Sequence, residues 1–150
     1  MSHTYARLLC HGVFSTEGRR PFIRAEWRDR LYGYLSGILT NHQGRLIRAG
    51  GTADHVHVLM ELRPSICVAD AMRLLKANSS KWMHETFSGT QGLGWQTGYG
   101  AFSVSPSNAD AVVAYIDRQE EHHRNSTFQE EFRSLLRKHQ IEFDEATVWD

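Results

Sequence analysis

The stretch RLIRAGGTADHVHVLMEL, residues 45–62, decides how this chain folds. It holds two runs of strand-forming residues on either side of Gly50 and Gly51, which predicts a β-hairpin with a short connection. Side chains alternate along a strand, so His55 and His57 share one face while the hydrophobic residues beside them point to the other. We therefore expect one face of this strand to pack against helices and the other to present two imidazoles.

The segments on both sides of this hairpin alternate between strands and helices. Hydrophobic residues at three- and four-residue spacing indicate the helices, and turn residues or prolines separate the elements. The predicted strands are residues 4–15, 45–49, 54–62 and 94–105, and the predicted helices are residues 23–41, 66–85, 107–124 and 127–140. This order is the split βαβ pattern of an α+β, ferredoxin-like fold, with an antiparallel sheet, two helices on one face and additional C-terminal helices. The other face of the sheet is expected to be open.

The composition is typical of one globular domain, which we expect to span residues 1–150. Hydrophobic residues make up 41% of the chain and charged residues 23%, values that exclude a disordered or fibrous protein. No apolar run approaches the roughly 20 residues of a membrane span, and the N-terminal residues do not resemble a signal peptide. We therefore expect a cytoplasmic protein with no membrane partner. Cys10 and Cys67 are expected to be reduced thiols, because two cysteines in this context indicate neither a disulfide framework nor a zinc cluster.

The formal net charge is zero, but the charges are unevenly distributed. Residues 1–50 contain eight basic and three acidic side chains, whereas residues 107–150 contain five basic and ten acidic ones. A basic N-terminal part can bind phosphate groups of a polyanion, and it can equally be a solvated surface. The charge pattern alone leaves both interpretations open.

The pair His55 and His57 is the first candidate site. Two imidazoles two residues apart on a rigid strand can converge on one divalent cation, and the buried residues beside them would fix their positions. The alternative is a pair of surface or hydrogen-bonded histidines without a metal. Asp54 can orient one of these histidines, or it can simply begin the strand.

The second candidate site lies on the helix predicted over residues 107–124. At about 100° per residue, Tyr115, Gln119 and His122 share one face, and Tyr115 lies at the margin of the hydrophobic stripe. Tyr115 is therefore either a core residue or a functional hydroxyl beside polar groups that can bind a metal.

These segments together resemble a known family. They are STEGRRPFI (15–23), the HVH strand (55–57), LKANSSKW (75–82), GYGAFSVS (98–105) and AYIDRQEEHH (114–123). The combination is similar to the small single-tyrosine transposases of bacterial insertion sequences, the insertion-sequence 200/605 group of the HUH endonuclease superfamily. The resemblance covers nearly the whole chain. Its two-part motif, His-x-His followed later by Tyr-x-x-x-Gln, is far more specific than either part.

The resemblance implies roles for four residues. His55, His57 and Gln119 would be metal ligands for Mg²⁺ or Mn²⁺, and Tyr115 would be the nucleophile that forms a 5′-phosphotyrosine link. It also implies a single-stranded DNA substrate folded into hairpins, and a homodimer in which the tyrosine helix of one subunit completes the histidine site of the other. A phenol is a weak nucleophile near neutral pH because its pKa is about 10, so the cation would have to neutralise charge on the phosphate.

Several alternatives stay open at this level. Tyr99 is a rival nucleophile, and His122 is a rival ligand to Gln119, although Gln119 is closer to Tyr115 along the helix. Six basic residues are expected to contact the phosphates of the DNA backbone: Arg19, Arg20, Arg24, Arg73, Lys76 and Lys81.

Three rival functions also remain. The first is a housekeeping nuclease that acts on repeated palindromes. The second is a non-catalytic nucleic-acid-binding module, and the third is a metal hydrolase that activates water. The segment 141–150 packs either on its own domain or on a partner subunit.

Overall fold

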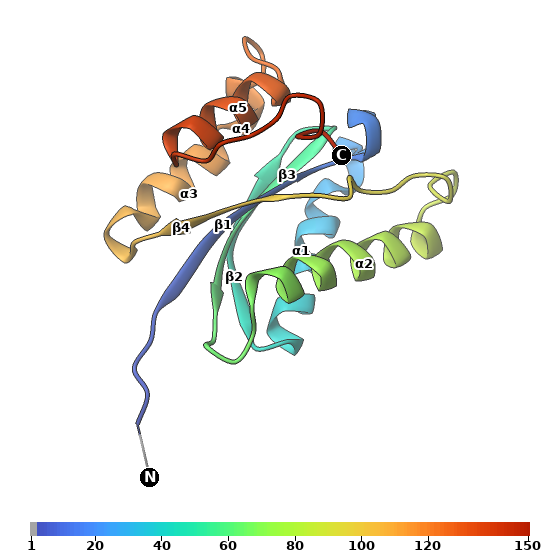
Figure 1. The fold of residues 1–150 in the computed structure, drawn as a ribbon. Helices are drawn as coiled ribbons and strands as arrows, with labels where there is room; N and C mark the ends of the chain where they lie inside the picture. Colours follow the sequence, from blue (N-terminus) through green and yellow to red (C-terminus); the bar gives the residue numbers. More distant parts are fainter. Residues whose placement is uncertain (1–2) are drawn as a thin grey trace.

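In a computed structural model, which describes residues 3–150, a four-stranded antiparallel sheet lies between two layers of helices (Figure 1). The order of strands across the sheet is β2-β3-β1-β4, as in a ferredoxin-like fold. The strands are β1 (Leu8–Ser15), β2 (Gly44–Gly51), β3 (His55–Leu62) and β4 (Gly100–Val104). The helices are α1 (Ala25–Asn41), α2 (Val68–Thr86), α3 (Ala109–Asp117), α4 (Gln119–His122) and α5 (Phe128–Lys138), with short 3-10 turns η1 (Glu17–Arg19) and η2 (Pro106–Asn108). The predicted α+β fold class is confirmed.

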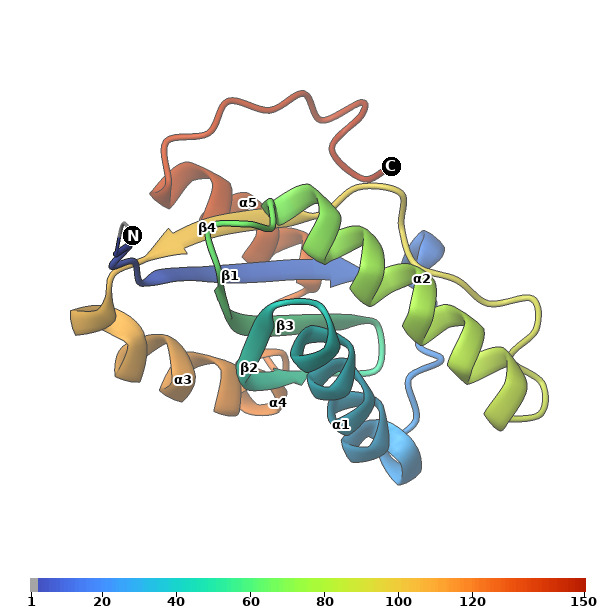
Figure 2. The ribbon, with the colours of Figure 1, turned by 90° about the horizontal axis from the view of Figure 1, so that it is seen from below.

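The first helical layer consists of α1 and α2, which cover one face of the sheet (Figure 2). Val56, Val58 and Met60 of β3 point into this layer and are fully buried there. They meet Leu35 of α1 and Leu75 of α2, as the alternation along the strand predicts. Burial of such side chains, worth about 1.5–3 kcal/mol each, holds the strand firmly in place. His55 and His57 consequently point to the opposite face.

The second helical layer contradicts the expectation that this opposite face is open. Ile116 of α3 packs against Leu59 of β3, and Phe132 of α5 packs against Val13 of β1. The reason is that the strands carry large hydrophobic residues on both faces, and these residues require a cover on each side. The sheet is therefore enclosed, and the two histidines lie inside a covered interface.

Several element boundaries differ from the predicted ones. Strand β2 extends through Gly51, and the hairpin turn is residues 52–54, where the Thr52 hydroxyl donates to the Asp54 carboxylate at 3.0 Å. The predicted helix over 107–124 is divided, because Arg118 leaves helical geometry (φ −96°, ψ 15°) between α3 and α4.

The predicted strand over 94–105 is shortened to the five residues of β4. The preceding residues form backbone hydrogen bonds outside the regular strand ladder. The backbone N–H of Gln96 donates to the Ser15 carbonyl and that of Gly98 donates to the Asp150 carbonyl, both at 2.9 Å. The segment 141–150 thus packs on its own domain, where Trp149 contacts the second layer. Within residues 3–150, no helix is both long and apolar enough to cross a bilayer.

Gly50 controls how closely α3 approaches the sheet. A Cβ atom at Gly50 would lie 2.7 Å from the backbone oxygen and a methyl carbon of Ile116, a distance that forces α3 to move. We expect Gly50→Ala to lower the free energy of unfolding by about 1–3 kcal/mol. Gly33→Ala is the matched control, because this helical glycine has open space around it and the change should be neutral or slightly stabilising. Urea denaturation measures both, and equal effects would contradict the expectation.

Candidate functional site

Polar side chains gather between the sheet and the second helical layer, in a region that is otherwise hydrophobic. They come from strands β1 and β3 and from helices α4 and α5. Those that are almost completely buried are His11, His55, His57, Gln119 and Glu131. Buried polar groups require partners, so their mutual contacts define the site.

The Glu131 carboxylate lies at the centre of these contacts. Its Oε1 atom is 3.0 Å from Nε2 of His57, 3.0 Å from Nε2 of His123 and 3.5 Å from Nε2 of His55. Its Oε2 atom accepts hydrogen bonds from the amide nitrogen of Gln119, at 2.7 Å, and from the hydroxyl of Tyr115. Glu131 thus joins the histidine strand to the tyrosine helix.

The Nδ1 atoms of His55 and His57, which face away from Glu131, each have a hydrogen-bond partner. Nδ1 of His55 lies 2.7 Å from the Asp54 carboxylate, and Nδ1 of His57 lies 2.8 Å from Nε2 of His11. In both rings Nε2 therefore points toward Glu131. Asp54 orients a histidine, which is one of the two interpretations that the sequence leaves open. Such a partner on the outer nitrogen is typical of histidines that bind metals.

The electrostatics of the site are dominated by burial and by Glu131. Burial alone would raise the pKa of Glu131, but hydrogen bonds from His123 and His57 outweigh this and hold that pKa well below its usual range. Burial, together with the neighbouring His57, lowers the pKa of His11 to about 3, so His11 is neutral. The site therefore contains a carboxylate anion and an uncharged supporting imidazole.

Tyr115 is half-buried, and its ring lies 5.7 Å from the ring of His57 in the same chain, centre to centre. Burial and the charge of Glu131 raise the pKa of Tyr115 above its usual value, so its hydroxyl keeps the hydrogen that it donates to Glu131. Although the helix is interrupted at Arg118, the structure brings Tyr115 and Gln119 onto the same carboxylate oxygen.

The donor set fits a divalent cation. Ligand atoms of His55, His57 and Glu131 all lie within 4.8 Å of one another. With the Nδ1 hydrogen of His55 directed at Asp54, its Nε2 faces Oε1 of Gln119 at 2.8 Å, and both atoms are then acceptors. Two facing acceptors need a positive charge between them, either a proton or a metal ion. The residues present can therefore hold a cation through nitrogen and oxygen ligands.

Three contributors to the site were not among the predicted site residues: His11, His123 and Glu131. A signal for Glu131 exists, because it shares the hydrophobic stripe of α5 with Phe128 and Phe132 and is a charged residue on that buried face. The alternation in β1 likewise places His11 on the same face as Val13.

The six predicted DNA-contact residues do not gather at this site. Arg73, Lys76 and Lys81 lie on α2, which covers the other face of the sheet. The Lys76 ammonium donates to the carbonyls of Thr97 and Gly98, at 2.8 and 3.0 Å, so it also braces a loop of its own chain. Arg19, Arg20 and Arg24 lie around η1, at the start of α1.

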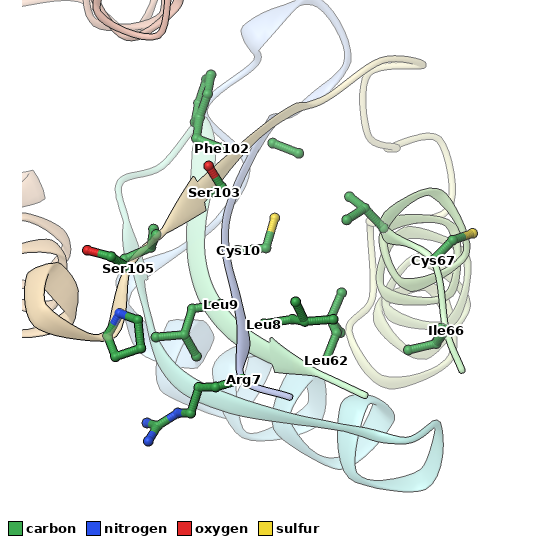
Figure 3. Close-up of a pocket in the computed structure, with 14 residues that line it drawn as sticks. Arg7, Leu8, Leu9, Cys10, Leu62, Ile66, Cys67, Phe102, Ser103 and Ser105 are labelled. Atoms are coloured by element: carbon green, nitrogen blue, oxygen red, sulfur yellow. The ribbon is translucent and has the colours of Figure 1, made fainter. Parts of the chain in front are cut away.

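An apolar groove lies away from the histidines, between the edge strand β4 and the start of α2 (Figure 3). Leu8, Cys10, Leu62 and Ile66 line it, and Cys10 is buried. Burial raises the pKa of this thiol, so it is an unreactive hydrophobic side chain. The groove therefore adds no chemistry to the histidine site.

Comparisons with known proteins identify related sequences. A family model described as "Transposase IS200 like" matches residues 4–119. The transposases for insertion sequence element IS200 of Salmonella typhimurium (strain LT2) and Salmonella typhi are both 31% identical to this chain over 87 residues. The match covers 58% of this chain and 57% of each relative, so the chain spans little more than half the length of these curated relatives.

Solved structures with a similar fold include two proteins. A candidate transposase from Deinococcus radiodurans R1 has a TM-score of 0.63 and 25% identity, over 79% of this chain and 96% of that one. The REP-associated tyrosine transposase bound to a REP hairpin has a TM-score of 0.59 and 12% identity, over 82% of this chain and 73% of that one. At 12% identity the second structure shows a common fold only.

Proposed function

Because this chain belongs to the family of IS200-like transposases, we propose that it cleaves and rejoins single-stranded DNA at the hairpin-bearing ends of an insertion sequence. Residues 1–150 would act as one HUH endonuclease domain, with Tyr115 as the nucleophile. The observation that carries the proposal is that Tyr115, Gln119 and both strand histidines converge on one buried carboxylate, Glu131.

The metal ligands in this proposal are His55, His57, Gln119 and Glu131, and the ion is Mg²⁺ or Mn²⁺. When bound, the ion would neutralise charge on a phosphate oxygen. The four side chains come from β3, α4 and α5, and their geometry is fixed by the packing described above. Such fixed positions are what a reaction at phosphorus requires, since much of its catalysis is orientation.

The covalent step uses atoms of this chain and of the DNA. The Tyr115 oxygen loses its proton and forms a bond to phosphorus, the bond from phosphorus to the 3′ oxygen breaks, and the 3′ oxygen takes up one proton to leave as a hydroxyl, so that the number of protons is unchanged. The product is a 5′-phosphotyrosine link. Because one ester replaces another, a different 3′-hydroxyl can later displace Tyr115 and join DNA without an energy source. Glu131 accepts the hydroxyl hydrogen of Tyr115 and so orients the oxygen for attack.

The test of this function is the covalent product. Full-length protein is incubated with Mn²⁺ and single-stranded DNA that carries a hairpin, and the protein is then digested and analysed by mass spectrometry. We expect a 5′-linked nucleotide on the peptide that contains Tyr115. Cleavage that leaves no protein on the 5′ end would instead support the metal hydrolase, in which water is the nucleophile.

Binding of single-stranded DNA is expected to weaken steeply as salt rises, since contacts with phosphates release counterions. Arg73, which is well exposed, should contribute about one unit to the slope of log affinity against log salt. We therefore expect Arg73→Ala to reduce affinity about equally for DNAs of different sequence. Arg133→Ala is the control, because Arg133 makes two hydrogen bonds to the Glu145 carboxylate, whereas Arg73 has only a looser ion pair with Asp70 at 3.8 Å. Fluorescence anisotropy at several salt concentrations measures both, and a loss confined to one sequence would contradict phosphate binding.

A further inference from the structure

We propose that His123 is a further metal ligand of this site, so that three imidazoles surround the ion and the site takes Mn²⁺ or another transition ion in preference to Mg²⁺. This inference rests on the proposed function, because it adds a ligand to the same metal centre. Neither the His-x-His nor the Tyr-x-x-x-Gln motif includes His123.

The position of His123 supports this role. Its side chain is only 10% exposed, and its Nε2 atom lies 3.0 Å from Oε1 of Glu131. The same oxygen is 3.0 Å from Nε2 of His57 and 3.5 Å from Nε2 of His55. The rings of His55 and His123 are 4.5 Å apart, centre to centre. Nε2 of each of these three imidazoles thus lies within 3.5 Å of one carboxylate oxygen, and Glu131 links the group of His55 and His57 to the group of His122 and His123.

The hydrogen bond at Nδ1 of His123 determines which nitrogen of this ring is available to bind a metal. Nδ1 of His123 lies 2.7 Å from the carbonyl oxygen of Ser126, which can only accept. Nδ1 therefore carries a hydrogen, and in the neutral ring the lone pair is on Nε2, directed at Glu131. A backbone carbonyl on the outer nitrogen is a common partner of a metal-bound histidine. His55, with Asp54 on its outer nitrogen, has the same arrangement.

A lone pair directed at a carboxylate oxygen needs a positive charge between them. A proton on Nε2 can supply it. A divalent ion supplies the same charge and satisfies His55 and Gln119 as well, whose facing acceptors lie 2.8 Å apart. One ion therefore supplies the positive charge that both contacts need, the one between His123 and Glu131 and the one between His55 and Gln119.

His122 provides the matched comparison. It is the adjacent histidine, and its ligand atom also lies within 4.8 Å of those of His123 and Glu131. However, its side chain is 41% exposed, and its Nε2 is 3.6 Å from Oε2 of Glu131, beyond hydrogen-bond distance. Oε2 is already engaged by Tyr115 and Gln119. His122 is therefore expected to contribute little to metal binding.

The proposed ligand set predicts which ions are preferred. Imidazole nitrogen suits Mn²⁺, Co²⁺ and Zn²⁺, whereas Mg²⁺ prefers oxygen ligands and gives up its water reluctantly. A site with three imidazoles, one amide oxygen and one carboxylate should therefore discriminate against Mg²⁺. Without His123 the ligand set becomes less rich in nitrogen, and this discrimination should weaken.

The experiment measures metal binding without DNA. Wild-type protein, His123→Ala and His122→Ala are stripped with chelator and checked for folding by circular dichroism. Mn²⁺ and Mg²⁺ affinities are then measured by calorimetry, and the Co²⁺ complex by visible absorption. We expect His123→Ala to weaken Mn²⁺ binding by about 10- to 100-fold and to change the Co²⁺ spectrum. Mg²⁺ affinity should change far less, and His122→Ala should behave like the wild type.

Unchanged Mn²⁺ affinity and an unchanged Co²⁺ spectrum in His123→Ala would overturn the inference, as would equal losses in both variants. If His123→Ala does not fold, His123→Phe keeps a ring without a ligand atom and is judged by the same measurements. These results are separate from the proposed function. A wild-type protein that forms the Tyr115 adduct while His123→Ala binds Mn²⁺ normally would refute only the ligand role of His123. A His123-dependent Co²⁺ spectrum without any DNA adduct would refute only the transposase chemistry.

Discussion

Tyr115→Phe is expected to fold, to bind Mn²⁺ and hairpin DNA, and to form no covalent adduct, so that DNA cleavage falls below detection. The phenyl ring keeps the contacts of the half-buried side chain, including the ring of His57. What is lost is the oxygen that would attack phosphorus and the hydrogen bond to Glu131. That hydrogen bond is to a charged group, so the free energy of unfolding should fall by about 1.5–3 kcal/mol.

Gel electrophoresis under denaturing conditions with 5′-labelled and 3′-labelled DNA measures the adduct, and a melting curve measures folding. Tyr99→Phe is the matched control, because Tyr99 lies beside Lys76, next to β4 and away from the histidines. It should form the adduct at the wild-type rate. Normal cleavage by Tyr115→Phe would require a different nucleophile, and the tyrosine mechanism would be wrong.

His57→Ala is expected to abolish cleavage and to weaken Mn²⁺ binding strongly. The imidazole is completely buried, and its two nitrogens bond to His11 and Glu131, so its removal leaves a cavity and deprives both of a partner. We expect a cost of about 2–4 kcal/mol in the free energy of unfolding. His84→Ala is the control, because His84, on helix α2 of the other layer, is a partly buried histidine whose ring hydrogen-bonds to the Leu93 carbonyl. It should keep full cleavage activity.

A mixture of Tyr115→Phe and His57→Ala tests the predicted composite sites. In a homodimer whose tyrosine helices are exchanged, one site of the mixed dimer would combine an intact tyrosine with intact histidines, and adduct formation would recover. In the structure, Tyr115 and His57 of one chain already lie beside each other, with ring centres 5.7 Å apart. If sites form only within one chain, the mixture stays inactive. The measurement is adduct formation after the two variants are refolded together.

Much of the fold follows from local periodicity. The alternation in residues 54–62 predicts correctly which side chains of β3 enter the α1 and α2 layer, because a strand has only two faces. The fold class follows from the order of elements alone. The helix boundaries at Asn41 and Lys138 are close to the predicted ones because hydrophobic spacing ends there.

What periodicity could not predict depends on contacts between distant segments. The second helical layer covers hydrophobic residues on the histidine-bearing face of β1 and β3. The alternation along these strands predicts a polar face there, so it does not indicate that this face is covered. Glu131 could not be assigned because its role depends on residues 74 and 12 positions away, His57 and Gln119. The break at Arg118 has no glycine or proline to signal it. Nothing in the sequence explains this break.

The distance along the chain between His57 and Glu131 has a consequence for biosynthesis. Glu131 follows His57 by 74 residues, so a ribosome adding about 5–20 residues per second makes the carboxylate roughly 4–15 s after the histidine. During that interval the growing chain contains the histidine strand but lacks α5, which supplies the carboxylate and covers that part of the sheet. Under the proposed function, a nascent chain would therefore lack the carboxylate that contacts His57 and Tyr115, and DNA cleavage would begin only after translation has passed α5.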